Sequence, residues 1–268
     1  MNHVQEKHKL DITKAPVGVF DSGVGGIGIL KALIQALPGE DFLYYGDNAN
    51  NPYGEKTEQE IRRLSLACVD RLLAQGCKAI LVACNTASSA AVDIMRERHQ
   101  VPIVAVEPAV RPAAQARKDG KVAVLATSAT LKQSLYLTRV QQCGIQDAVI
   151  NMPAPELVQL VESDILSGPV MEAALEALFL PYKGQKVDCL VLGCTHYLHI
   201  RPAIEQVAAR FWPETVVLDG NEGIARQMGS VLAEAGLLNA RGGGGCVVFD
   251  SSDPTPQRMA QFQRLLKS

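Results

Sequence analysis

The chain has 268 residues, of which 47% are hydrophobic and 20% are charged, so it has the composition of a globular protein with a buried core and not of a disordered one. Its 26 basic and 28 acidic residues give a net charge of −2 without an extended basic run, which argues against a dedicated nucleic-acid-binding protein. The longest uncharged stretch, Ala79–Val92, has 14 residues and is shorter than the roughly 18 apolar residues that a membrane span requires.

Residues 1–14 are polar and of mixed charge, and they lack the apolar segment of a signal peptide. We therefore expect a flexible N-terminal extension and a cytoplasmic protein. The seven cysteines agree with that compartment, because their number is odd and none forms a Cys-x-x-Cys pair of the kind found in zinc ribbons and thioredoxin-like proteins.

Short apolar runs alternate with longer helix-like stretches along the remaining chain. In chain order we expect a strand at 17–20, a helix at 29–37, a strand at 41–45, a helix from 57 to 75, a strand at 79–83, a helix at 88–98, strands at 103–106 and 122–126, a helix at 131–142, a helical region at 155–180, a strand at 189–192, a helix after residue 202, strands at 216–218 and 247–249, and a helix at 259–266. This alternation, with strands that are continuous apolar runs, predicts an α/β protein whose parallel sheets are covered on both faces.

Two pairs of segments indicate that the chain has two related halves. Residues 79–86 and 189–196 are both apolar runs that end in a cysteine with a threonine just beyond it, and residues 17–22 and 122–128 are a weaker pair of strands that end in small polar residues. Ligands of open α/β sheets bind beyond the carboxyl ends of the strands, where all these polar residues lie. We therefore expect two pseudo-symmetric parallel-sheet α/β domains that face an active-site cleft. Their expected boundaries are 15–107 plus 218–268 for the first domain and 108–217 for the second.

Cys84 and Cys194 are the most informative residues for function. Free cysteine is often a small buried hydrophobic residue, and we interpret five cysteines in that way: Cys68, Cys77, Cys143, Cys189 and Cys246. Cys84 and Cys194 differ because each lies where a strand gives way to polar residues, and backbone amides, a helix N-terminus or a basic neighbour can ionise a thiol there. Two such thiols across a cleft suit a proton transfer in which one removes a proton from carbon and the other returns one on the opposite face.

His196 follows Cys194 by two residues. A lone histidine is most often structural or solvated, but at this position it would serve as an acid–base partner or orient a substrate carboxylate. A zinc site formed by Cys84, Cys194 and His196 is a less favoured alternative, because the paired spacings of structural zinc sites are absent.

A glycine-rich turn, residues 23–28, fits the pattern Gly-x-Gly-x-x-Gly and lies between an expected strand and an expected helix. This placement, with Asp47 at the end of the next strand, is compatible with dinucleotide binding. However, the Asp21 carboxylate at the start of the turn would repel a pyrophosphate. The alternative is a tight turn whose free amides hold a small anion such as a carboxylate.

Short hydrogen-bonding side chains follow several of the expected strands. Singly, each would be a helix cap or a turn residue, but as a set that converges on one cleft they predict a site for a small, polar, carboxylate-bearing ligand. The set consists of Ser22, Asn85, Thr86, Thr127, Thr130 and Thr195.

Together these segments resemble glutamate racemase, of the cofactor-independent aspartate/glutamate racemase family, which supplies D-glutamate for peptidoglycan. The similarity covers nearly the whole chain from residue 17 onward. Its motifs are Asp-Ser-Gly-Val-Gly-Gly at 21–26, Tyr-Gly-Asp at 45–47, Pro-Tyr-Gly at 52–54, Ala-Cys-Asn-Thr-Ala-Ser at 83–88, Glu-Pro-Ala at 107–109, Thr127 with Thr130, and Leu-Gly-Cys-Thr-His-Tyr at 192–197.

The resemblance implies that L- and D-glutamate are interconverted without a cofactor or metal, with Cys84 and Cys194 as the paired proton donor and acceptor. Asp21 and His196 would assist the two thiols. The implied substrate-binding residues are Asp21, Ser22, Tyr53, Gly54, Asn85, Thr86, Thr127, Thr195 and His196. Asp47 and Glu162 match acidic residues that support the site in the family, although a surface helix carboxylate is the simpler interpretation of Glu162.

The chain departs from the family pattern at Leu198, where a proline usually stands, and at 219–223, which lacks a common serine; we expect a local loop change at Leu198 without loss of chemistry. Members with an N-terminal extension can be activated by UDP-N-acetylmuramoyl-L-alanine, and many members are homodimers. Three other functions remain open: a racemase for aspartate or another small acid, a nucleotide-binding or metabolite-sensing module, and an additional role in inhibiting a partner such as a topoisomerase.

Overall fold

The computed structural model describes residues 11–268. Of the expected flexible extension, residues 1–14, the first ten residues lie outside the described part of the chain. Its last part is ordered, because Ile12–Lys14 form a single 3-10 turn in which the Asp11 carboxylate accepts a hydrogen bond from the amide of Thr13.

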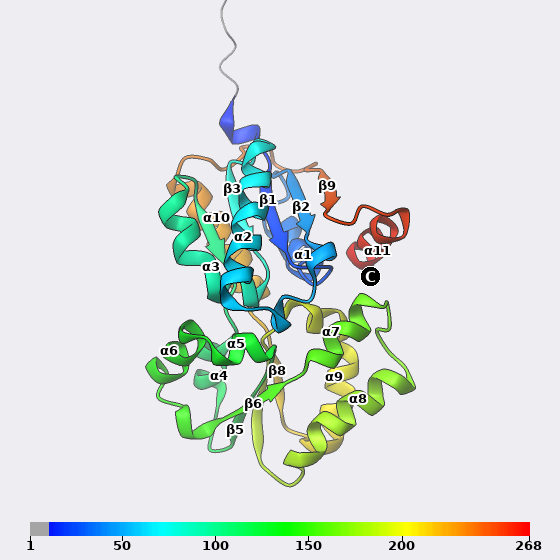
Figure 1. Ribbon diagram of the computed structural model, residues 1–268. Coiled ribbons are helices and arrows are strands. Elements are labelled where there is room, and N and C mark those ends of the chain that lie inside the picture. The colour runs from blue at the N-terminus through cyan, green and yellow to red at the C-terminus, as the bar shows by residue number, and fades with distance from the viewer. Residues whose placement is uncertain (1–10) are drawn as a thin grey trace, which may run out of the picture.

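The strands form a five-stranded and a four-stranded sheet, one above the other in Figure 1. The first sheet has the order β4-β3-β1-β2-β9 and consists of β1 (Val17–Asp21), β2 (Phe42–Gly46), β3 (Ala79–Val82), β4 (Ile103–Ala105) and β9 (Val247–Ser251). The second has the order β6-β5-β7-β8 and consists of β5 (Lys121–Ala126), β6 (Val149–Pro153), β7 (Val187–Leu192) and β8 (Val216–Leu218). Every adjacent pair of strands is parallel, as the alternation of apolar runs and helices predicts.

The strand orders confirm that the two halves are related. The order β4-β3-β1-β2 in the first sheet repeats as β8-β7-β5-β6 in the second, and β9 is an extra edge strand of the first. Under this correspondence β3 matches β7, which are the strands that precede Cys84 and Cys194. The correspondence therefore places each of these cysteines at the carboxyl end of an equivalent strand.

Helices cover both faces of each sheet. They are α1 (Ile27–Ala36), α2 (Glu58–Ala74), α3 (Asn85–Arg98), α4 (Val110–Ala116), α5 (Ser128–Lys132), α6 (Ser134–Gln142), α7 (Pro155–Glu162), α8 (Pro169–Phe179), α9 (Arg201–Phe211), α10 (Asn221–Glu234) and α11 (Pro256–Lys267). Within residues 11–268, no helix is long and apolar enough to cross a membrane.

The core consists of three apolar clusters that differ in extent. One cluster packs α2 and α3 on the first sheet, and a second packs α4 and α6 on the second sheet. The largest joins the two halves, because it runs from α1, α10 and α11 through Tyr197 and Ile200 into α7, α8 and α9. The two halves are thus held together by the buried apolar side chains of this largest cluster. They also share a cavity, whose lining comes from both halves.

Several expected elements have different boundaries in the structure. The expected helix 88–98 begins at Asn85, because the Cys84 sulfur itself caps its first turn. The expected helix 131–142 is two helices, since Gln133 is extended between α5 and α6. The helical region 155–180 is also interrupted, and Gly168 with φ of 87° precedes the second helix.

Three elements were missed by the sequence patterns: α4, β6 and α10. In β6, Asn151 and Pro153 alternate with buried Ile150 and Met152, so the strand is not a continuous apolar run. Two glycines lie within α10 and weaken its helical signal.

Candidate active site

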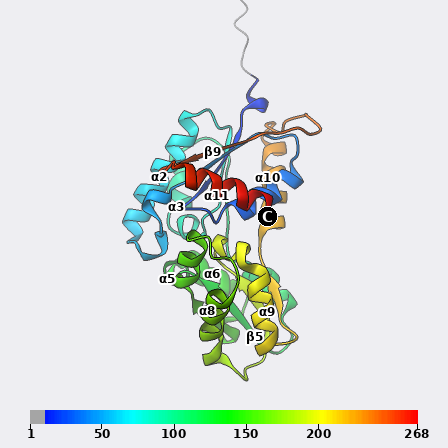
Figure 2. The same cartoon turned by 90° about the vertical axis from the view of Figure 1, so that its right-hand side faces the viewer.

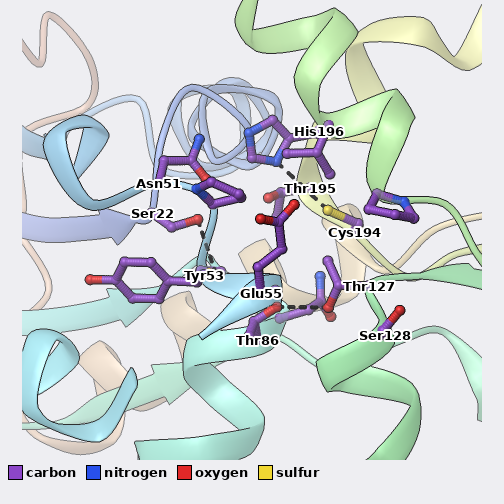
Figure 3. Close-up of a pocket in the computed structure, with 16 residues that line it drawn as sticks. Ser22, Asn51, Tyr53, Glu55, Thr86, Thr127, Ser128, Cys194, Thr195 and His196 are labelled. Atoms are coloured by element: carbon purple, nitrogen blue, oxygen red, sulfur yellow. Dashed lines mark hydrogen bonds between the residues drawn. The ribbon is translucent and has the colours of Figure 1, made fainter. Parts of the chain in front are cut away.

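A cavity of about 340 Å³ lies between the two halves, at the carboxyl ends of the strands (Figure 3). It is lined by Ser22, Asn51, Pro52, Tyr53, Gly54, Glu55, Cys84, Asn85, Thr86, Thr127, Ser128, Pro155, Val158, Cys194, Thr195 and His196. Ten of these sixteen were expected in the site from sequence. Asp21, Asp47, Glu162 and Thr130 were also expected there, but they do not line the cavity and lie behind residues that do.

Cys84 presents its sulfur from the end of β3, at the first turn of α3. The sulfur accepts a hydrogen bond from the amide of Ala87 at 3.5 Å and donates one to Ser22 Oγ at 3.4 Å. Burial, assisted by the negative charge of Asp21, raises the pKa of the Cys84 thiol to about 12. The raised pKa favours the protonated thiol, which can act as a proton donor.

Cys194 lies at the equivalent position of the second half and contacts a charged histidine. Its Sγ is 3.6 Å from His196 Nδ1, and His196 Nε2 is 2.8 Å from Glu162 Oε1. Burial lowers the pKa of His196, but the hydrogen bonds and charges of Cys194 and Glu162 outweigh burial and hold the net pKa well above its ordinary value. These contacts therefore favour the cationic form of the imidazole, which would place a positive charge beside the Cys194 sulfur.

Glu162 is not the surface carboxylate that the pattern of its helix favours. Its side chain is 15% exposed, and its Oε1 atom accepts hydrogen bonds from His196 Nε2 and from the amide of Val24 at 3.0 Å. Burial raises the pKa of this carboxyl, but His196, the Val24 amide and Arg258 outweigh burial, so the pKa lies below its usual range. Glu162 therefore holds the histidine from outside the cavity, and no local sequence pattern indicates this long-range contact.

Asp21 is fully buried behind the cavity wall. Its carboxylate accepts hydrogen bonds from the amide of Gly23 at 2.8 Å and from Thr195 Oγ1 at 3.1 Å. Burial raises the pKa of Asp21 above its usual value, although His196 and these hydrogen bonds act against it. Asp21 thus orients Thr195 and the turn after β1 and is not among the residues that line the cavity.

Asp47 acts on the cavity through Tyr53. The Tyr53 hydroxyl donates to Asp47 Oδ2 at 2.6 Å, and Asn50 Nδ2 donates to Asp47 Oδ1 at 2.9 Å. Tyr53 is itself buried and belongs to the short turn Tyr53–Glu55. Asp47 therefore fixes the loop that brings Tyr53 and Gly54 to the cavity.

Threonine hydroxyls connect the two halves at the floor of the cavity. Thr86 Oγ1 and Thr127 Oγ1 are 2.9 Å apart, and Thr130 Oγ1 lies 2.9 Å from Thr127 Oγ1 and 3.3 Å from Thr86 Oγ1. Nearby, the side-chain oxygens of Asn51 and Asn85 are buried and have no hydrogen-bond partner among the described residues. The cavity thus offers both hydroxyls and unpaired amide groups to a polar ligand.

The glycine-rich turn packs against the second half of the molecule. A Cβ atom at Gly23 would lie 2.0 Å from Glu162 Oε1, and one at Gly25 would lie 2.4 Å from Thr195 Oγ1. At Gly25 the Cβ would also lie 2.8 Å from the backbone nitrogen of His196, so glycine is required there. The Gly23 and Val24 amides are already bonded to Asp21 and Glu162. Because these two amides already have carboxylate acceptors, they are not free to hold a pyrophosphate, which argues against the dinucleotide-binding interpretation.

The zinc alternative is also disfavoured by geometry. Cys84, Cys194 and His196 line the same cavity. However, within the described part of the chain no three His, Cys, Asp or Glu side chains are grouped closely enough to hold a metal ion. The imidazole is instead engaged by Cys194 and Glu162, one at each ring nitrogen.

Sequence reasoning missed several residues of the lining. Asn51 and Glu55 flank the motif Pro-Tyr-Gly, and Ser128 follows Thr127, so adjacency to motifs is the signal that could have found them. Figure 3 shows the Glu55 side chain directed into the middle of the cavity.

The fold and the cavity define a class of α/β protein in which two related halves each present a thiol to a shared polar cavity. Comparison with known proteins agrees with this class. Residues 25–228 match the model of the family described as Asp/Glu/Hydantoin racemase. A glutamate racemase from Clostridium botulinum (strain Alaska E43 / Type E3) is 35% identical over 260 residues, which are 97% of this chain and 100% of that protein.

Two solved structures extend the similarity to the whole fold. Glutamate racemase from Francisella tularensis in complex with D-glutamate is 29% identical with a TM-score of 0.82, covering 96% of this chain and 95% of that chain. Glutamate racemase from Escherichia coli, in complex with L-glutamate and the activator UDP-MurNAc-ala, is 29% identical with a TM-score of 0.81, covering 94% of both chains. The present chain belongs to the Asp/Glu/hydantoin racemase family and, within it, to the glutamate racemases.

Proposed function

We propose that this protein interconverts L- and D-glutamate by removing and returning the proton on Cα, with Cys84 and Cys194 as the two acid–base groups. The observation that carries this proposal is the presence of one thiol from each half in a single polar cavity of a glutamate racemase fold. The product D-glutamate is a building block of peptidoglycan. The reaction uses no cofactor, in keeping with the family.

The unequal surroundings of the two sulfurs support a defined starting state. A two-base reaction needs one thiolate to remove the proton and one thiol to supply another. Burial and Asp21 keep Cys84 protonated, whereas the cationic His196 stabilises negative charge on Cys194. When the C–H bond breaks, its electron pair remains on Cα and its proton passes to one sulfur. The S–H bond of the other sulfur then breaks as its proton forms the new C–H bond on the opposite face.

The lining explains why the substrate would be a small dicarboxylic amino acid. Hydroxyls from Ser22, Thr86, Thr127 and Thr195 and the amide of Asn85 can bond carboxylates and the ammonium group. The cavity volume of about 340 Å³ lies at the lower end of the range for ligand sites. These features fit glutamate, and aspartate is the second candidate because the hydroxyls do not by themselves measure side-chain length.

Incubation with L-glutamate in D2O, without added cofactor, tests the proposed function. Optical rotation should fall to zero while solvent deuterium enters Cα, and a parallel reaction with L-aspartate should be much slower. If rotation and Cα–H are both unchanged, UDP-MurNAc-L-alanine is added, because an E. coli relative was solved with that activator. Absence of exchange under both conditions would overturn the proposal, and binding of a nucleotide without turnover would support a binding module instead.

The pH dependence of the reaction should depend on His196. Because the pKa of this imidazole is raised, the charged form persists at pH values above the ordinary pKa of histidine. It is lost only as the pH rises through the raised pKa. We expect kcat/KM to be maintained from about pH 7 into the alkaline range and to fall there. His196→Asn should lower kcat/KM by about 100-fold and remove that alkaline limb. An unchanged limb in the variant would assign it to another group.

Several expectations stay predictions beside this function. We propose that the domain boundaries fall near residues 107 and 217, that the protein is cytoplasmic, and that it forms a homodimer. Limited proteolysis, cell fractionation and sedimentation would test the three separately.

A further inference from the structure

The C-terminal helix α11 reaches the site through a partly buried ion pair. Figure 2 shows α11 crossing the outside of the first half, and in Figure 1 α7 lies directly below it. Arg258, in the first turn of α11, donates from Nη1 to Glu162 Oε2 at 2.9 Å, and the two side chains are only 19% and 15% exposed. The same Arg258 atom donates to Gln261 Oε1 at 2.7 Å. Gln261 in turn donates to the Glu162 carbonyl at 3.2 Å.

The two oxygens of Glu162 have different partners. Oε2 accepts from Arg258, while Oε1 accepts from His196 Nε2 and from the Val24 amide. A carboxylate is planar and rigid, so a bond that holds Oε2 also fixes the direction of Oε1. An unbroken line of contacts therefore runs from Arg258 through Glu162 and His196 to the Cys194 sulfur.

Charge acts in the same direction as geometry. With Arg258 in place, the negative charge of Glu162 is shared between two cations, His196 and Arg258. Without Arg258, the carboxylate is compensated only by His196, and negative charge on Cys194 is less well stabilised. Loss of the bond would also let Glu162 and His196 move away from the sulfur. Both effects reduce the reactivity of the same thiol.

We propose that Arg258 is a positioning residue for the racemase reaction, which acts through Glu162 and His196 to stabilise negative charge on Cys194. This inference rests on the proposed function. The C-terminal segment follows a glycine-rich connector at 242–245 and does not line the cavity. By this inference it nevertheless contributes to the reaction through Arg258.

The structure provides a matched control on the same helix. Arg264 pairs with Asp164 at 2.5 Å, with both side chains about half exposed, and so links α11 to the turn after α7 without touching Glu162. A substitution of Arg264 removes an α11 arginine and an ion pair to the same region. Any effect of α11 docking alone should therefore be shared by the two arginines, whereas an effect through Glu162 should be confined to Arg258.

The test compares Arg258→Met, Arg258→Lys and Arg264→Met in the full-length protein. Racemisation by Arg258→Met should show kcat/KM lowered about tenfold, equally in both directions because the two enantiomers have equal free energy. Arg258→Lys should recover most of this loss, since it keeps the charge, and Arg264→Met should stay within about twofold of the parent. In a Glu162→Gln background, Arg258→Met should have no further effect. Equal losses of kcat/KM in Arg258→Met and Arg264→Met would overturn the inference. It would also be overturned if Arg258→Met lowered kcat/KM by the same factor in the Glu162→Gln background as in the parent.

A second readout does not depend on racemisation. The rate at which iodoacetamide alkylates Cys194 is measured by peptide mass spectrometry, with the exposed Cys246 as the internal standard in the same molecule. Because the thiolate is the reactive form, Arg258→Met should slow alkylation of Cys194 several-fold and leave the rate at Cys246 unchanged. An unchanged Cys194 rate would overturn the inference even if the protein racemises glutamate. A parent protein that does not racemise would instead overturn the proposed function, and the neutral variant Arg258→Gln provides the same comparison if Arg258→Met does not fold.

Discussion

Cys84→Ser and Cys194→Ser are each expected to lower glutamate racemisation by at least about 1,000-fold. A serine hydroxyl has nearly the same size as the thiol, so the cavity keeps its shape, but it is a much weaker acid and is not ionised by its surroundings. Since one group must remove the proton and the other must supply one, neither thiol can replace its partner. Near-normal turnover in either variant would contradict the two-base mechanism.

Each single variant should still retain part of the chemistry. The remaining thiol lies on one face of Cα, so it can exchange the Cα proton of one enantiomer with D2O without inverting it. We expect Cys84→Ser to exchange one enantiomer and Cys194→Ser the other, as measured by NMR on L- and D-glutamate separately. This pattern would assign each sulfur to its substrate face. Cys246→Ser is the control, because Cys246 is exposed and does not line the cavity.

Lys78→Met is expected to lower the free energy of unfolding by about 3–5 kcal/mol without changing the catalytic site. The Lys78 ammonium is fully buried and lies 2.5 Å from the equally buried Glu40 carboxylate. Glu40 also accepts from the amide of Asn239 at 2.7 Å, and Lys78 donates to the Thr13 carbonyl. Removing the cation leaves a buried carboxylate without its counter-charge, and the segments around residues 13 and 239 lose a common anchor.

Chemical denaturation of Lys78→Met and of the double variant Lys78→Met/Glu40→Gln measures this effect. The double variant should recover part of the lost stability, because the unpaired charge is gone. Lys186→Met is the matched control, since Lys186 pairs with Asp119 at an exposed position and should contribute about 0–1 kcal/mol. Equal losses in Lys78→Met and Lys186→Met would show that the buried pair is not special. Because Lys78 and Glu40 precede the parallel strands β3 and β2, they lie at the amino ends of the strands, whereas the cavity lies at the carboxyl ends.

Local patterns in the sequence were sufficient to predict the strands that carry the site. Continuous apolar runs predicted β1, β3, β5 and β7, and the repeated plan around Cys84 and Cys194 predicted that the halves are related. These signals are short-range, because a buried strand needs only a few consecutive apolar residues and the residues after it are adjacent in sequence. For the same reason the lining residues that follow these strands were expected, whereas Tyr53 and Gly54 were expected only from the resemblance to glutamate racemase.

Helix ends and irregular strands were predicted less well. Cys84 caps α3 with its sulfur, which is not among the usual capping side chains, so the helix began three residues earlier than expected. In β6 the buried and exposed residues alternate, because the strand lies at an edge of its sheet. These differences arise where the surroundings of a segment, and not its own composition, decide its conformation.

The chemistry around the thiols depends on contacts that no local pattern contains. Thr195 bonds Asp21 across 174 residues, His196 bonds Glu162 across 34, and Arg258 bonds Glu162 across 96. Residue types and their order were enough to locate the two cysteines and the family. Only the packing of the halves turned Glu162 inward, enclosed Asp21 and brought α11 to the site. The reason is that burial and the pairing of charges depend on which distant segments meet, and not on which residues are neighbours in the chain.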